Sequence, residues 1–282
     1  MDLTQIIKEL EGDKKIIDAF LVPLKEIYRL DKDRKNNFQQ LTTRLNKLEE
    51  ISRKPTGNFS QKDGFFEWVT KYRNDLDEVQ KEIEKRFGLE LNDALKKVNI
   101  SLSGQYPDLK AGLFTIQINF ESMSATLWFG PKQEYLFKCR LTVKDIVDKI
   151  INSTMELGCK LDSIEFARKL EEAFLKQSTK LMSKAVPIIK VLTEFALSTQ
   201  SSQFYQDPRR DNYRGYGRAD FSYDLFKRVK LEPESILSKK LHLSVASLAD
   251  TKKRQDFLWI PDDITGKGTT YAYLQFKEEK HE

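Results

Sequence analysis

The chain is poor in the side chains that bind metals or pair with catalytic nucleophiles. Among 282 residues there are two histidines, His242 and His281, and two cysteines, Cys139 and Cys159. Zinc sites and nucleophile–histidine pairs both need a histidine beside a suitable partner. The cysteine spacing fits neither a metal motif nor a disulfide framework. We therefore expect no metal, no cofactor and reduced cysteines, as in a cytoplasmic protein.

Long apolar runs are also missing. No stretch approaches the roughly 20 residues that a membrane-spanning helix needs, and the start, Met1-Asp2-Leu3-Thr4, lacks the basic region and apolar run of a signal peptide. Hydrophobic residues make up 39% of the chain and charged residues 32%, which is enough apolar material for well-packed cores. The composition predicts a cytoplasmic protein without membrane contact, with a length typical of about two domains.

Motifs for phosphate binding and nuclease chemistry are absent or incomplete. The chain has no Gly-x-x-x-x-Gly-Lys loop and no Gly-x-Gly-x-x-Gly turn. Asp108 precedes a strand pattern, as in restriction-type nucleases, but neither Glu121 nor Glu134 is followed by the x-Lys that would complete a metal-binding pair. A metal-dependent nuclease therefore remains a third hypothesis, and the sequence favours a protein without enzymatic activity.

Two heptad patterns predict an antiparallel helical hairpin within residues 1–90. The segments are 38–51 and 65–87, with a proline-glycine turn between them. We expect a preceding helix that Pro23 breaks or kinks and that buries Ile16, Ile17, Phe20 and Leu21, and we expect Gly88 to end the second arm. Two interpretations stay open: a helical domain packed on its own chain, or a coiled-coil arm that binds a partner or self-associates. The seam residues are Phe38, Leu41, Leu45 and Leu48 against Val69, Tyr72, Leu76 and Val79.

Beyond residue 100 the apolar period changes to two. Alternating segments at 114–120, 125–129 and 135–139 are separated by polar or glycine-proline turns. This pattern is typical of an antiparallel meander with one buried face. A helix over 142–157 is expected to cover that face, which gives a small α+β module at 91–158.

The remaining residues, 159–282, have the element order of a winged-helix domain. Helical patterns at 163–182, 187–199 and 219–230 are followed by strand patterns. The predicted fold is therefore α+β: an N-terminal antiparallel helical hairpin, a small antiparallel β-meander with a covering helix, and a C-terminal winged-helix-like domain.

Basic and aromatic residues cluster before and within the helix predicted at 219–230. The whole chain carries a net charge of only +5, but residues 200–230 hold seven basic side chains against four acidic ones. Arginines offer forked donors to phosphate, and tyrosines can stack on bases. The competing interpretation is that the arginines pair with neighbouring aspartates. The predicted nucleic-acid-binding residues are Arg209, Arg210, Tyr213, Arg214, Tyr216, Arg218, Lys227, Arg228 and Lys267.

These observations give a leading hypothesis and an alternative. The leading hypothesis is a non-catalytic adaptor subunit that binds nucleic acid, duplex DNA in the first instance, through the helix at 219–230 and a wing around Lys267. The hairpin at 38–87 would contact a protein partner or a second copy. The alternative is a protein–protein scaffold subunit of a multiprotein machine, such as one for antiviral defence or chromosome maintenance. The nucleic-acid hypothesis is favoured if the basic residues share one open face. The scaffold hypothesis is favoured if they form ion pairs within the chain.

Overall fold

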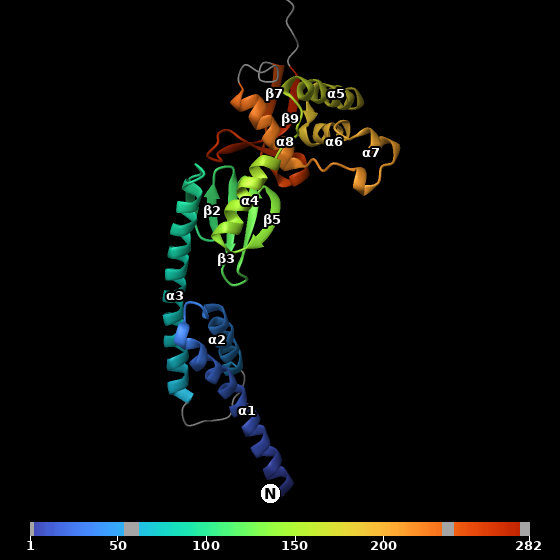
Figure 1. Cartoon of the computed structure of the whole chain (residues 1–282). Coiled ribbons are helices and arrows are strands. Elements are labelled where there is room, and N and C mark those ends of the chain that lie inside the picture. Colours follow the sequence, from blue (N-terminus) through green and yellow to red (C-terminus); the bar gives the residue numbers. More distant parts are fainter. Residues whose placement is uncertain (1–2, 54–61, 233–239, 277–282) are drawn as a thin grey trace, which may run out of the picture. The chain divides into compact units, whose positions relative to one another are not determined.

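The computed structural model describes residues 3–53, 62–232 and 240–276. They belong to two compact units, Met1–Glu90 and Leu91–Glu282. The first is helical and the second combines helices with antiparallel strands, so the predicted α+β class is confirmed (Figure 1). Each unit is described by itself below.

The first unit is built from α1 (Leu3–Leu30), α2 (Phe38–Ser52) and most of α3 (Lys62–Lys96), with a short 3-10 turn, η1 (Asp31–Asp33), after α1. Glu49, late in α2, pairs with Arg73, early in α3, whereas Lys35, just before α2, pairs with Glu82. The two helices therefore run in opposite directions. Helix α1 shares their core, which contains Phe20, Ile27, Leu41, Leu45, Leu48, Val69, Tyr72 and Leu76.

The expected stop at Gly88 does not occur, because α3 continues to Lys96. Helix α1 is not broken at Pro23, where a break or a kink was expected. Glycine costs a helix about 1 kcal/mol relative to alanine, but Leu91 and Leu95 beyond it are fully buried. Burying a leucine contributes about 2 kcal/mol, so packing outweighs the local preference of Gly88.

The first part of the second unit is an antiparallel sheet in the order β1-β2-β3-β4-β5. The predicted meander corresponds to β3, β4 and β5, while β1 and β2 were not anticipated because they are short and β1 is largely exposed. Helix α4 (Val143–Glu156) buries Ile146 and Ile150 and lies across the sheet in Figure 1. The strands are β1 (Leu102–Gln105), β2 (Asp108–Ala111), β3 (Phe114–Asn119), β4 (Ser124–Phe129) and β5 (Glu134–Arg140).

The rest of the second unit places helices on a smaller sheet in which β9 pairs with each of the other strands. Its core is rich in aromatic side chains, among them Phe166, Phe195, Phe221 and Phe226. The helices are α5 (Ser163–Leu181), α6 (Ile188–Ser198), α7 (Ser202–Gln206) and α8 (Arg218–Leu225), which a π-helical segment, Phe226–Leu231, extends. The strands are β6 (Val186–Pro187), β7 (Leu241–Val245), β8 (Leu258–Pro261) and β9 (Gly268–Phe276).

Side-chain contacts join these two parts of the second unit. Phe129 at the end of β4 packs edge-to-face on Trp259 of β8, with ring centroids 5.5 Å apart. Glu134, at the start of β5, is buried and pairs with both Arg218 and Arg254. The boundary proposed at residue 158 therefore falls inside one compact unit, and a division into separate domains there stays a prediction.

Candidate functional site

The recognition helix expected over 219–230 corresponds to α8 and the π-helical segment that follows it. All residues of α8 are described and none is fully exposed, whereas Lys227 of the π-helical segment is exposed. Ser222 donates a hydrogen bond of 2.5 Å to the carbonyl of Trp259 in β8, and Asp220 accepts one from the backbone N–H of Gly158. Because β8 and the turn at Gly158 both contact α8, most of its side chains pack within the unit, and only Arg218, Asp220 and Tyr223 are half-buried.

Asp224 of α8 is the centre of a buried polar cluster. Its carboxylate accepts hydrogen bonds from the Tyr216 hydroxyl at 2.7 Å, the Cys159 backbone N–H at 2.8 Å and the Arg228 guanidinium at 2.5 Å. Arg228 also donates to the carbonyl of Leu161, and its side chain is about 4% exposed. Tyr216 and Arg228, two of the predicted nucleic-acid contacts, therefore hold the fold together.

The same cluster suppresses titration of its neighbours. Burial, assisted by the negative charge of Asp224, raises the pKa of Tyr216 well above its usual value. Burial and Asp224 also raise the pKa of Cys159 to about 12. Since the thiolate is the reactive form of cysteine, the raised pKa disfavours reaction of Cys159 at neutral pH.

Arg218 is also committed inside the second unit. Its guanidinium donates to Glu134 at 2.5 Å and to the carbonyls of Arg254 and Phe257 at 2.8 and 2.7 Å. The sequence-based alternative was that the arginines pair with neighbouring aspartates. Arg218 does form an ion pair within the chain, but its partner, Glu134, is remote in sequence. Arg218 therefore links the start of β5 to α8.

The expected wing packs against the sheet of the same unit. Gly266, in the turn between β8 and β9, has a positive φ of 82°, and a Cβ there would overlap the carbonyl oxygen of Gly112. The turn is thus docked on the β2–β3 connection, although Lys267 itself is exposed.

Six of the predicted residues remain at the surface: Arg209, Arg210, Tyr213, Arg214, Lys227 and Lys267. Arg209 pairs with Asp207. Within the described residues, the side chains of Arg210, Arg214, Lys227 and Lys267 form no ion pair. Gln200 fixes the connector by exchanging two hydrogen bonds with the backbone of Arg214. The nine predicted residues therefore divide into a buried structural set and an exposed set.

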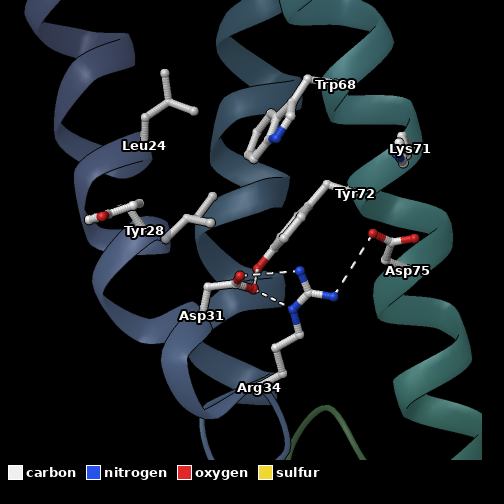
Figure 2. Close-up of a pocket in the computed structure, with 9 residues that line it drawn as sticks. Leu24, Tyr28, Asp31, Arg34, Trp68, Lys71, Tyr72 and Asp75 are labelled. Carbon is white, nitrogen blue, oxygen red and sulfur yellow. Dashed lines mark hydrogen bonds and ion pairs between the residues drawn. The ribbon is translucent and has the colours of Figure 1, made fainter.

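A second candidate site, which the sequence patterns did not indicate, lies in the helical unit. Figure 2 shows a pocket between α1 and α3, with a volume of about 430 Å³. Its aromatic lining is accessible, because Tyr28 is 79% exposed and Trp68 36%. Trp68 stacks on Tyr72 with centroids 5.0 Å apart. The lining residues are Leu24, Ile27, Tyr28, Asp31, Arg34, Trp68, Lys71, Tyr72 and Asp75.

A polar network closes one end of this pocket. The Tyr72 hydroxyl donates to Asp31 at 2.7 Å, and Arg34 donates to the same carboxylate at 2.5 and 3.1 Å and lies 3.9 Å from Asp75. The hydrogen bond from Arg34 lowers the pKa of Asp31 below its usual value, and burial raises the pKa of Tyr72. Asp31, Arg34 and Asp75 already interact with one another at this end. The apolar end of the pocket is therefore the part that is available to a ligand.

Helix α1 extends that apolar surface beyond the pocket. Ile17 is 51% exposed and Leu21 40% exposed, so the expectation that they lie in the core is wrong. With Leu24 and Tyr28 they form a stripe at spacings of 4, 3 and 4, beside the buried stripe of Phe20 and Ile27. One feature of the sequence could have indicated this stripe: the apolar residues of α1 cover a wider arc of the helix than a single buried face needs.

The nuclease hypothesis gains no geometric support. Asp108 forms a 2.7 Å ion pair with Lys132. Across the described residues, no group of three or more histidine, cysteine, aspartate or glutamate side chains is placed to hold a metal ion.

Comparisons with known proteins give no relative from which a function could be inferred. No family model, no curated protein and no solved structure matches the chain. In the part of the chain that the structure describes, no helix is both long and apolar enough to cross a membrane.

Proposed function

We propose that this chain is a non-catalytic scaffold subunit that binds a protein partner through the open surface of α1 and α3. The observation that carries the proposal is the exposed stripe of Ile17, Leu21 and Tyr28, with Trp68 across the pocket. Clustered exposed apolar side chains mark interaction sites, and tryptophan and tyrosine are the residues that most often dominate binding energy.

The second unit supports the same proposal because several of its predicted nucleic-acid contacts bond within the unit. Tyr216, Arg218 and Arg228 donate to groups inside the unit, and most residues of α8 are buried. The aromatic and basic residues that resemble a nucleic-acid surface in sequence thus serve stability at these positions.

Site-specific photo-crosslinking of the full chain in the cells that natively express it tests the proposal. A photoreactive residue at Leu21 should capture one discrete protein. The same residue at Lys47, which is exposed on α2 and outside the pocket, should not. Absence of an adduct at Leu21, or equal adducts at both positions, would overturn the proposal.

A second candidate is binding of duplex DNA by the connector between α7 and α8. It is favoured by Arg210 and Arg214, which are exposed on either side of the exposed Tyr213 and form no ion pair within the described residues. It keeps the winged-helix-like interpretation, supported by the order α5, α6, α8, β7, β8 and β9, but places the phosphate contacts on the connector. Failure of the full chain to bind labelled duplex DNA at low salt would remove this candidate.

A further inference from the structure

We propose that the groove between α1 and α3 holds one amphipathic helix of a partner protein, which completes a four-helix bundle and places acidic residues along α1. This inference rests on the proposed protein-binding function and specifies the chemistry of the partner. Its basis is the direction of the helices, the spacing of the exposed apolar residues, and the charge along the rim.

The helix directions leave a place for a further antiparallel helix. Phe20 contacts Phe65, with ring centroids 5.2 Å apart, and Asp31 bonds Tyr72, so α1 and α3 run in the same direction. Helix α2 runs against both and lies behind them in Figure 2, with the pocket residues in front. Helix α2 packs antiparallel to α1 and α3 on one side of the pair. A partner helix in the groove could pack antiparallel to them on the opposite, open side. This is the up-down-up-down arrangement of a four-helix bundle.

The apolar residues of the groove have the spacing that a helix needs. Ile17, Leu21, Leu24 and Tyr28 repeat at 4, 3 and 4 on α1, with Leu24 half-buried, and on α3 Trp68 stacks on the buried Tyr72. Such seams accept the side chains of a neighbouring helix, whereas a strand would match a period of two. The pocket volume of about 430 Å³ gives room for large apolar side chains of the incoming helix.

The rim of the groove on α1 is basic. Lys14, Lys25 and Arg29 are exposed and form no ion pair among the described residues, and the exposed acids on the same side of α1 are Asp18 and, one turn before Lys14, Glu11. By helical rotation these residues lie beside the open stripe, on the side away from the core. On α3 the rim carries Glu67, Lys71 and Asp75, and Asp75 lies 3.9 Å from Arg34. Flanking charges select partners in helical bundles, so the incoming helix should be acidic where it faces α1.

The same charges disfavour a second copy of the chain as the occupant. If α1 of another copy entered the groove, it would bring its own Lys14, Lys25 and Arg29 against the same basic rim. Like charges placed opposite one another oppose association. Self-association is therefore an alternative outcome of the test and not our expectation.

The experiment uses the full chain and three fluorescent model peptides of equal length. One is an amphipathic helix with leucine on its apolar stripe and glutamate on its flanks, the second has lysine in place of glutamate, and the third is a scrambled version of the first. Fluorescence anisotropy should show the glutamate peptide binding at least about tenfold more tightly than the lysine peptide, since several modest rim pairs add. The scrambled peptide should not bind.

Variants locate the binding. Leu21→Glu should abolish binding of the glutamate peptide, while Leu89→Glu, at an exposed leucine outside the pocket, should leave it unchanged. The double variant Lys25→Glu and Arg29→Glu should reverse the preference toward the lysine peptide. Circular dichroism of each variant verifies that the helices remain folded.

Two results would overturn the inference. Equal or absent binding of both helical peptides would exclude an acidic helix as the occupant. Self-association in sedimentation experiments that Leu21→Glu removes would assign the groove to a second copy. The crosslink at Leu21 is an independent readout. If a partner is captured but the peptides bind equally, the proposed function stands and the inference of an acidic helix fails. If the glutamate peptide binds preferentially but no partner is captured, the proposed function fails and the preference of the groove for an acidic helix stands.

Discussion

Helices α1 and α8 show that exposure cannot be deduced from the sequence of a helix alone. Helix α8 has charged residues and follows a basic connector, yet most of it is buried, and Arg218 and Asp224 bond within the protein. Helix α1 has an apolar arc wide enough for a buried helix, yet Ile17, Leu21 and Tyr28 face solvent. The charges of α8 stabilise the fold, while the apolar residues of α1 are free for a partner.

The largest expected effect tests whether the charges around α8 are structural. Arg228→Ala removes one member of a buried ion pair and leaves the Asp224 carboxylate without its counter-charge. The free energy of unfolding should fall by about 3–5 kcal/mol. Urea denaturation followed by circular dichroism measures it. Arg210→Ala, at an exposed arginine, is the matched control and should change stability by less than about 0.5 kcal/mol; similar losses in both variants would contradict the structural role.

A somewhat smaller loss is expected at the turn that contacts α8. Gly158 has a φ of 84°, and a Cβ there would lie 2.8 Å from the Asp224 carboxylate. Gly158→Ala should reduce the free energy of unfolding by about 1–3 kcal/mol through backbone strain and displacement of Asp224. Thermal denaturation checks this, with Gly215→Ala as the control, because a Cβ at Gly215 meets no atom within 4 Å. An unchanged midpoint for Gly158→Ala would show that the turn adapts without cost.

The polar end of the α1–α3 pocket should contribute less. Tyr72→Phe removes the hydrogen bond to Asp31 and should cost about 1 kcal/mol. The folded-state pKa of Asp31 is lowered, so the stability it gives is present above its unfolded pKa, near 3.9, and is lost as the pH falls through the folded value. The effect of Asp31→Asn on unfolding should therefore shrink from pH 7 toward pH 3. A pH-independent effect would mean that the ionised carboxylate is not what stabilises this end.

The smallest effect on stability is expected at the exposed connector, where the outcome concerns binding. If the connector contacts phosphates, the double variant Arg210→Ala and Arg214→Ala should weaken duplex DNA binding on all sequences alike. The slope of log affinity against log salt should flatten by about two units. Fluorescence anisotropy at several salt concentrations measures this, and the double variant Lys138→Ala and Lys144→Ala, outside the connector, serves as control. A slope that neither pair changes would place any DNA contact elsewhere.

The sequence by itself determined the local elements of this protein. The spacing of Leu41, Leu45 and Leu48 predicted α2, and the alternation from Phe114 to Phe120 predicted β3, because each pattern directly records which side of a helix or strand is buried. Most residues of the α2 and β3 patterns are buried, Leu45 and Ile116 among them, whereas Tyr135 in the alternation predicted at 135–139 is exposed.

Only the tertiary structure decided what each charged or apolar surface does. Whether Arg218 faces water depends on Glu134, 84 residues away, and whether Tyr216 faces water depends on the packing of α8 against the rest of its unit. Likewise, the two apolar stripes of α1 are equivalent in sequence, and the positions of α2 and α3 determine which one is covered. The physical reason is that exposure is a property of contacts between segments remote in the chain, which no local period records.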